Sequence, residues 1–121
     1  DLFAAIAPTK CGMTIGGHEP LEGTQPLSIM QVIGDADKSY HGSSGQYPMY
    51  SAKERIDIWS TFNECGKPVF TDHGTYTSTH YGCDNSKEIE LVTLKGVGHN
   101  LGEWAPVTDE MLIQFLLKQR K

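Results

Sequence analysis

The chain has 121 residues, of which 38% are hydrophobic and 21% charged, with 10 Lys and Arg against 15 Asp and Glu. The net charge of −5 argues against a nucleic-acid or anionic-membrane partner, because no basic run is longer than the tail at residues 118–121. No stretch approaches 18 consecutive apolar residues, so the sequence predicts no membrane-spanning helix. We expect one domain with one small core.

The strand signals, in chain order, indicate an α/β fold. Residues 2–8 form a short apolar run that ends in Pro-Thr, which is typical of a strand buried on both faces. Residues 28–34 repeat that pattern, and residues 88–94 alternate partly, which predicts a more solvated strand. Extended pieces at residues 69–71 and 75–80 are candidates for an edge ribbon. With a helix before and after the third main strand, this order predicts parallel strands joined by right-handed crossovers.

Two amphipathic helices accompany these strands. The first begins at Ser51, where a Ser-Ala-Lys-Glu motif matches a capping box, and Gly66 is expected to end it. Its apolar stripe consists of Ala52, Ile56, Trp59 and Phe62. The second is expected to begin near Thr108. Three buried strands and two helices cannot cover both faces of a parallel sheet, so we expect a further segment or a partner chain to cover the remainder.

Three cysteines are too few for a disulfide-stapled miniprotein, and they lack the C-x-x-C spacing of a structural zinc site. Cys65 and Cys83 each lie beside turn residues, where two surface loops could meet, whereas Cys11 lies in a separate glycine-rich loop. One bridge with one leftover cysteine is the natural interpretation, with Cys65 and Cys83 as the candidate pair, although sequence alone does not fix connectivity. A bridge would indicate an oxidising compartment, so that the protein would be secreted or periplasmic.

Ionisable side chains follow two of the three buried strands. Asp35 and Asp37 come directly after the second strand, and His99, flanked by glycines, follows the third. Because reactive groups collect at the carboxyl ends of parallel strands, we expect an acid and a histidine to meet there. An acid that orients an imidazole is the arrangement of a general base. A simple exposed turn is the alternative interpretation of Gly-Asp-Ala-Asp.

These residues resemble a known family. The segment from Ile29 to Asp37, followed by Tyr40, is similar to the strand, acid and tyrosine segment of secreted α/β-hydrolase esterases related to polyhydroxybutyrate depolymerases and to feruloyl and acetylxylan esterases. Val-Gly-His ending at His99 is similar to their Gly-Gly-His segment. The helix that ends at Cys65 and the later Cys83 also resemble that group. The likeness covers residues 1–121 as the C-terminal portion of a three-layer α/β-hydrolase domain.

The resemblance implies an ester substrate, which could be a polymer, and a Ser-His-Asp triad in which Asp37 is the acid and His99 the base. Tyr40 and Trp104 lie a few residues from these two, and each is a candidate either for core packing or for lining the acyl pocket. The sequence departs from the family pattern at Ile33, at Asp35 and in the Asn-Leu-Gly that follows His99. These departures bear on the substrate more than on the triad.

The family's nucleophile motif G-x-S-x-G does not occur in residues 1–121, and Gly-Ser-Ser-Gly at residues 42–45 is one residue too short. We therefore expect the serine on a missing N-terminal half or on a partner chain, and the isolated chain to be inactive. The chain begins with Asp1, which fits a portion of a longer protein. We expect no cofactor and no metal, because Asp35 with Asp37, and His80 with Cys83, lack further ligands at suitable spacing.

A second interpretation belongs to a different functional class. The chain could be a non-catalytic module that keeps a hydrolase-like half-fold and binds a polysaccharide or a polyester through its glycine-rich loops and aromatic side chains. The two interpretations differ in whether a reactive serine accompanies the chain. Labelling by a fluorophosphonate probe separates them.

Overall fold

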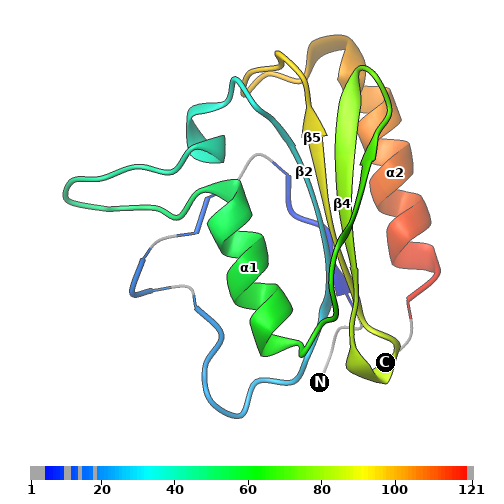
Figure 1. Ribbon diagram of the computed structural model, residues 1–121. Helices are drawn as coiled ribbons and strands as arrows, with labels where there is room; N and C mark the ends of the chain where they lie inside the picture. The colour runs from blue at the N-terminus through cyan, green and yellow to red at the C-terminus, as the bar shows by residue number, and fades with distance from the viewer. Residues whose placement is uncertain (1–4, 10–11, 14, 18, 120–121) are drawn as a thin grey trace.

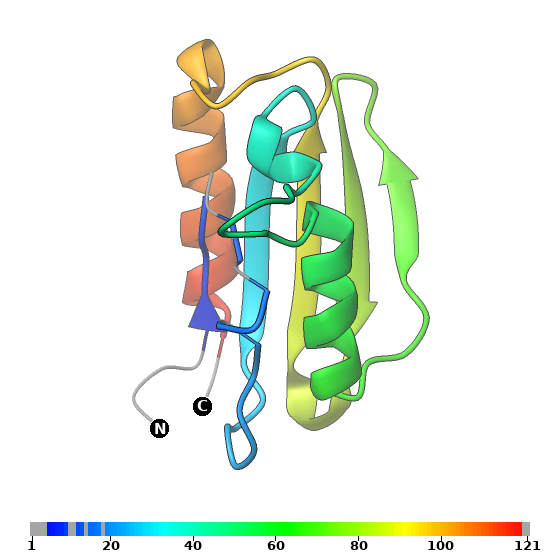
Figure 2. The ribbon, with the colours of Figure 1, turned by 90° about the vertical axis from the view of Figure 1, so that its left-hand side faces the viewer.

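The computed structural model describes residues 5–9, 12, 13, 15–17 and 19–119 and shows an α/β architecture with a five-stranded mixed sheet. The strand order is β1(Ala5–Ile6), β2(Ser28–Gly34), β5(Glu88–Leu94), β4(Tyr76–Gly82) and β3(Val69–Asp72). Helix α1(Ala52–Phe62) lies on one face of the sheet and helix α2(Ala105–Leu117) on the other (Figure 1). Seen from the α1 side, β1 and β3 lie at opposite edges (Figure 2).

The first half of the sheet is parallel, as the sequence predicts. Strand β1 pairs with β2, and β2 pairs with β5 through six residue pairs from Ile29 with Ile89 to Gly34 with Leu94. All of β2 is buried, in agreement with its apolar run. Strand β1 differs from the expectation, because Ala5 is half-buried and Ile6 is exposed. It is the edge strand, and Ile6 borders an open hollow; residues 2–4 lie outside the described residues.

The second half of the sheet is antiparallel, so the sheet is mixed, while the three main strands β1, β2 and β5 are parallel as expected. Strand β4 pairs with β5 and β3 pairs with β4, which confirms the edge ribbon expected at residues 69–71 and 75–80. The connection between β3 and β4 is short and includes Gly74 at a φ of 91°. A connection of that length joins only antiparallel strands, since a parallel pair needs a crossover of a dozen or more residues.

Helix α1 begins as predicted. The Ser51 hydroxyl accepts from the Glu54 amide at 3.1 Å, and the Glu54 carboxylate accepts from the Ser51 amide at 2.9 Å, which completes the capping box. The helix ends at Phe62, earlier than the glycine expected to end it, because Glu64 turns to a φ of 54°. Helix α2 begins at Ala105, three residues before the expected start, with a proline in its first turn.

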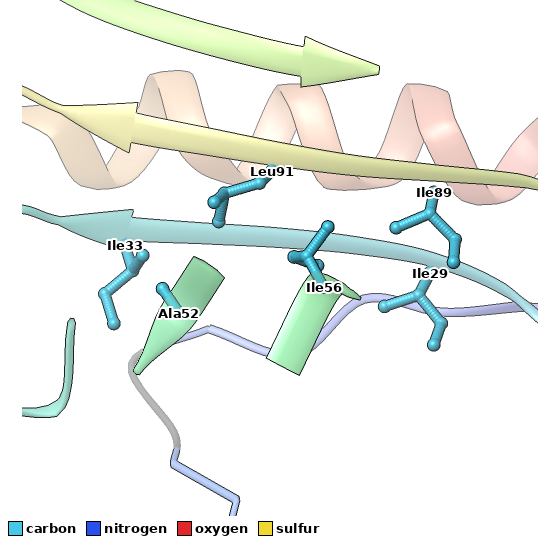
Figure 3. Packing of buried hydrophobic residues seen from close by; sticks show 6 residues of the cluster. All are labelled: Ile29, Ile33, Ala52, Ile56, Ile89 and Leu91. Atoms are coloured by element: carbon cyan, nitrogen blue, oxygen red, sulfur yellow. The ribbon is translucent and has the colours of Figure 1, made fainter. Parts of the chain in front are cut away.

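Two buried apolar clusters hold the helices to the sheet. On the α1 face the cluster consists of Ile29, Ile33, Ala52, Ile56, Ile89 and Leu91 (Figure 3). On the α2 face it consists of Met30, Val32, Val92, Leu94, Leu101 and Phe115. Alternate residues of β2 and β5 supply opposite clusters, because successive side chains of a strand point to opposite faces.

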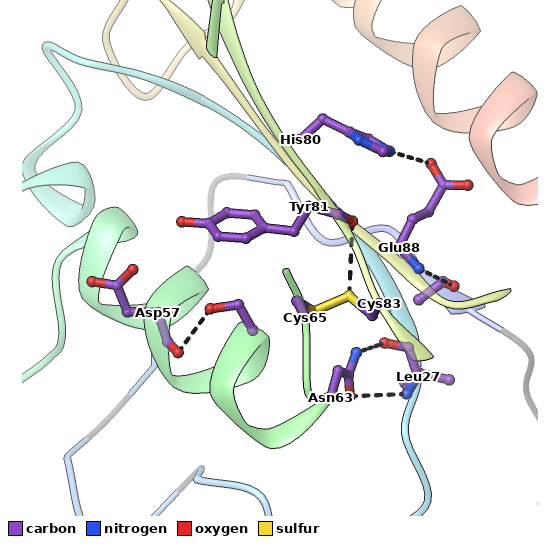
Figure 4. The surroundings of a disulfide bond; sticks show 10 residues. Leu27, Asp57, Asn63, Cys65, His80, Tyr81, Cys83 and Glu88 are labelled. Atoms are coloured by element: carbon purple, nitrogen blue, oxygen red, sulfur yellow. Dashed lines mark hydrogen bonds and ion pairs between the residues drawn. A yellow bond between two sulfur atoms is a disulfide. The ribbon is translucent and has the colours of Figure 1, made fainter. Parts of the chain in front are cut away.

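A disulfide joins Cys65, which follows α1, to Cys83, which follows β4 (Figure 4). Both cysteines pack against the α1-face cluster. The neighbouring Asn63 side chain is tied to Leu27, because its Nδ2 donates to the Leu27 carbonyl at 2.8 Å. The end of α1 is thus fastened to the hairpin and to the segment that leads into β2. Cys11 lies outside the described residues.

Among the described residues, no helix combines the length and the apolar character needed to cross a membrane.

Candidate active-site edge

Asp37 and His99 meet at the carboxyl ends of β2 and β5. The two strands are adjacent and parallel, so the loops that follow them lie at one edge of the sheet. His99 Nδ1 lies 3.0 Å from Asp37 Oδ2. Because a carboxylate only accepts, the imidazole nitrogen is the donor. The structure therefore brings together the two side chains on which the sequence interpretation depends.

The loop geometry leaves little freedom at this edge. A Cβ on Gly34, the last residue of β2, would overlap the carbonyl oxygen of Val97, so only glycine fits where the loop after β5 passes the end of β2. The Ala36 amide donates to that same carbonyl at 3.0 Å. The Asp35 carboxylate accepts from the Gly96 amide at 2.7 Å, so Asp35 joins the two loops and Asp37 contacts the histidine.

Asp37 is buried, and hydrogen bonds from Ser39 fix its carboxylate. Its side chain caps the short 3-10 helix η1(Lys38–Tyr40), and its Oδ1 accepts from the Ser39 amide at 3.0 Å and from the Ser39 hydroxyl at 2.9 Å. Burial alone would raise the pKa of Asp37, but the hydrogen bonds from Ser39 and the contact with His99 outweigh it and lower that pKa. Asp37 is therefore a carboxylate at neutral pH.

A buried arginine supports this loop from α1. Arg55 is 5% exposed, and its Nη1 donates to the carbonyls of Ser39 and Tyr50 at 3.0 Å each. Its Nε donates to Gln31 Oε1 at 3.2 Å. Arg55 thereby fixes the loop that carries Asp37 against the sheet. The sequence reasoning missed both Arg55 and Ser39, although an arginine beside the apolar stripe of α1 was a usable signal.

The His99 ring is open on its outer side. It lines a hollow of about 340 Å³ together with Ala36, Asp37 and Lys38. Within the described part of the chain, no hydroxyl group hydrogen-bonds to the ring. In the described residues, neither Ser43 nor Ser44 of the Gly-Ser-Ser-Gly segment lines this hollow or hydrogen-bonds to the ring, so the segment supplies no nucleophile to it.

The two aromatic candidates lie on different faces. Tyr40 packs against the α1-face cluster and also lines a cleft on that face. Trp104 packs against the α2-face cluster, where the Tyr76 ring meets it edge-on at 6.1 Å between centroids. The structure thus brings Tyr40, and not Trp104, to the cleft. A substrate contact remains a prediction for both residues.

The cleft beside Tyr40 is a feature that sequence reasoning did not find. It has a volume of about 440 Å³ and lies between α1 and the hairpin of β3 and β4, over the α1 face of β5; we call it the hairpin cleft. Its lining includes Lys53 and Asp57 of α1, Phe70 of β3, Thr79 of β4 and Thr93 of β5. The alternation of residues 75–80 was the signal that could have placed threonines on one face.

A metal centre finds no support in the part of the chain that the structure describes, because no group of three or more His, Cys, Asp and Glu side chains could hold an ion there. Cys83 is engaged in the disulfide, which removes it as a zinc ligand beside His80.

No protein-family model, curated protein or solved structure matches this chain.

Proposed function

We propose that the chain is the C-terminal portion of a serine carboxylesterase, in which Asp37 and His99 are the acid and base of a Ser-His-Asp triad. The observation that carries this proposal is the 3.0 Å contact between Asp37 Oδ2 and His99 Nδ1 at the carboxyl ends of two parallel strands. The lowered pKa of Asp37 supports it, since the acid must stay ionised while the imidazole gains a proton.

In this proposal the serine comes from outside residues 1–121. Its hydroxyl oxygen attacks the ester carbonyl carbon while His99 Nε2 takes the hydroxyl proton, and Asp37 stabilises the imidazolium that forms. His99 then gives that proton to the departing alcohol, which leaves an acyl-enzyme. Water, deprotonated by His99, attacks the acyl carbonyl carbon. His99 then gives that proton to the serine oxygen as the bond between the acyl carbon and this oxygen breaks, which releases the acid and the free serine. The open outer side of the His99 ring is where the serine would have to lie.

The test uses the full gene product that contains this chain. We expect it to hydrolyse an aryl ester and to react with a fluorophosphonate probe, and we expect Asp37→Asn to lower kcat about ten-thousandfold, because the imidazole loses its orienting anion. Asp109→Asn, an exposed carboxylate of α2, is the matched control and should keep full activity. A gene without G-x-S-x-G upstream of residue 1, or equal activity in both variants, would contradict the proposal.

A second candidate is a non-catalytic module that binds a polysaccharide or a polyester. The observation that favours it is the hairpin cleft, which is lined by polar and aromatic side chains independently of any serine. A full-length native product that binds polymer but is never labelled by the fluorophosphonate would support this candidate over the esterase.

A further inference from the structure

The loop that carries His99 is anchored at its start and not at its centre. Before the histidine, the Val97 carbonyl accepts from the Ala36 amide at 3.0 Å. Among the described residues, the backbone of Gly98 and His99 makes no hydrogen bond. The position of the imidazole therefore depends on its bond to Asp37 and on whatever holds the chain that follows it.

The bond to Asp37 is exposed to competition from water. The His99 side chain is 69% exposed, and within the part of the chain that the structure describes, Asp37 is the one side chain that hydrogen-bonds to the ring. Water can offer the ring nitrogens other partners, so a single hydrogen bond does not by itself fix the orientation of the imidazole. A second constraint on the loop is needed for Nδ1 to stay toward Asp37.

The chain after His99 is held by apolar side chains on the α2 face. Leu101 is 8% exposed and belongs to the α2-face cluster. Its carbonyl accepts from the Trp104 amide at 3.0 Å, which closes the short 3-10 helix η3(Gly102–Trp104). Trp104 packs against the same cluster and is also the N-cap of α2. The far end of the His99 loop is therefore fixed where Trp104 is fixed.

Tyr76 holds the Trp104 ring from the hairpin of β3 and β4. It is the first residue of β4 and lies opposite Leu94, the last residue of β5, so it lies at the end of the sheet where β5 leads into the His99 loop (Figure 1). The two ring centroids are 6.1 Å apart and the ring planes meet at 80°. This edge-to-face arrangement is one of the two that aromatic pairs prefer.

Tyr76 is in turn fixed by the turn that precedes it. The His73 ring stacks on the Tyr76 ring with centroids 4.4 Å apart, and His73 Nε2 lies 3.2 Å from the buried Ser78 hydroxyl. The Lys95 amide, directly after β5, donates to the Thr75 carbonyl at 3.1 Å. The turn thus offers Trp104 a ring that is held in place by stacking and by the backbone.

We propose that Trp104 and Tyr76 are positioning residues for His99. Their contact fixes the end of the His99 loop, so that Nδ1 keeps facing Asp37. A neutral imidazole carries one ring proton, and the bond to Asp37 keeps that proton on Nδ1, which leaves Nε2 free to accept a proton. The use of Nε2 in ester hydrolysis rests on the proposed function; the orientation of the ring does not.

The experiment measures which ring nitrogen of His99 carries the proton, by ¹⁵N chemical shifts of the histidine rings in the chain of residues 1–121 in alkaline buffer, where the imidazole is neutral. We expect Nδ1–H to dominate in the wild type. Trp104→Leu and Tyr76→Leu should each lower the ratio of Nδ1–H to Nε2–H about threefold to tenfold, which is what an aromatic pair contributes. Tyr76→Phe keeps the ring and should keep the wild-type ratio.

Trp59→Leu is the matched control. Trp59 is also half-buried, packs against the α1-face cluster and meets Phe62 edge-on at 5.7 Å between centroids, but it belongs to α1. Its loss should weaken packing and leave the His99 ratio unchanged. A wild-type chain without the Nδ1–H form, unchanged ratios in both leucine variants, or an equal fall in Trp59→Leu would overturn the proposal.

The two Tyr76 variants keep the test decisive if Trp104→Leu does not fold. A Tyr76→Phe chain that behaves like Tyr76→Leu would overturn the proposal, because the ring would then not be what holds Trp104. In a full gene product with esterase activity, Trp104→Leu should lower kcat about threefold to tenfold and leave KM unchanged, and an unchanged kcat would contradict the role. The ring measurement needs no serine, so the esterase proposal can fail while this one stands.

Discussion

The two faces of the sheet are closed in different ways. On the α2 face, Phe115 is 2% exposed and lies in a cluster of apolar side chains from the strands and the helix. On the α1 face, an aliphatic cluster shares the space with buried Gln31 and Arg55, with a disulfide, and with the hairpin cleft. The polar side chains of the α1 face reduce the apolar area that is buried there. The same side chains hold the Asp37 loop in place or line the hairpin cleft.

The two faces of the sheet therefore contribute to the structure in different ways. Apolar burial stabilises in proportion to area and has no direction, whereas hydrogen bonds to buried groups fix side chains in one geometry. We therefore expect the α2 face to dominate folding stability, and the α1 face to depend on a few specific bonds. Four changes test this expectation.

The largest effect is expected at the centre of the α2 face. Phe115→Ala should reduce the free energy of unfolding by about 3–5 kcal/mol, because it removes a buried ring and leaves a cavity between α2 and the sheet. Urea unfolding followed by circular dichroism measures it. Leu117→Ala is the control on the same helix, since Leu117 is 68% exposed and should change stability by no more than about 0.5 kcal/mol. Equal losses would contradict the apolar closure of this face.

The second effect concerns the disulfide bond on the α1 face. Replacing Cys65 and Cys83 together by serine should cost about 3 kcal/mol, because the bridge closes a loop with a sequence separation of 18 residues. The unfolding curve of the reduced wild-type chain should then coincide with that of the double variant. A wild-type chain that keeps its stability in reductant, with its thiols shown to be free, would show that the α1 face does not depend on this tie.

Local patterns in the sequence predicted the parts of the fold that depend on neighbouring residues alone. The apolar run at residues 28–34 is a strand because all of it is buried, and Ser51 caps α1 through its own neighbours. The antiparallel half was foreseen only as a ribbon, since pairing of β4 with β5 depends on contacts between segments that no local pattern encodes. The start of α2 was missed because a tryptophan, and not a polar side chain, occupies its N-cap.

The sequence likewise predicted only part of the candidate site. Strand-end placement selected Asp37 and His99, and the structure brings them within hydrogen-bond distance. Ser39 and Arg55 were not foreseen, because their contacts depend on how η1 folds back against α1. The hairpin cleft was also missed, since it exists only after α1 and the hairpin have been placed over the same face of β5.

A smaller effect is expected where the α1 face supports the candidate acid. Ser39→Ala removes the hydroxyl that donates to Asp37 Oδ1 and should cost about 1–2 kcal/mol at pH 7, since the bond is to a charged group. The lowered pKa of Asp37 sets the sign of the pH dependence. Its stabilising contribution is complete above the ordinary value of 3.8 and is lost as the pH falls through the lower folded-state pKa.

Urea unfolding of both chains at pH 7 and in acid measures this difference. The gap between the wild type and Ser39→Ala should narrow in acid, because protonated Asp37 no longer gains from the hydroxyl. Ser44→Ala changes an exposed serine of the following loop and should match the wild type throughout. A gap that stays constant with pH would show that Ser39 supports the loop without acting on the Asp37 carboxylate.

The smallest effect is expected from the acid that interrupts the apolar α2 face. Burial raises the pKa of Glu90, while His80 and Lys118 oppose that shift only in part. A raised pKa makes the carboxylate a cost at neutral pH, and that cost disappears as the pH falls through the raised value. Glu90→Gln should therefore stabilise the chain at pH 7, by less than Ser39→Ala destabilises it, and the gain should shrink in acid.

Glu88, two residues earlier on the same strand, is the matched opposite. Burial would raise its pKa too, but Gln119, His80 and Lys118 contact its carboxylate at 3.1 to 3.3 Å and lower it. Glu88→Gln should therefore destabilise the chain at pH 7, where Glu90→Gln stabilises it. If both substitutions changed the free energy of unfolding in the same direction, the location of these carboxylates on the α2 face would matter more than their hydrogen-bond and ion-pair partners. Opposite signs would show that even on the apolar face specific bonds decide whether a buried charge stabilises.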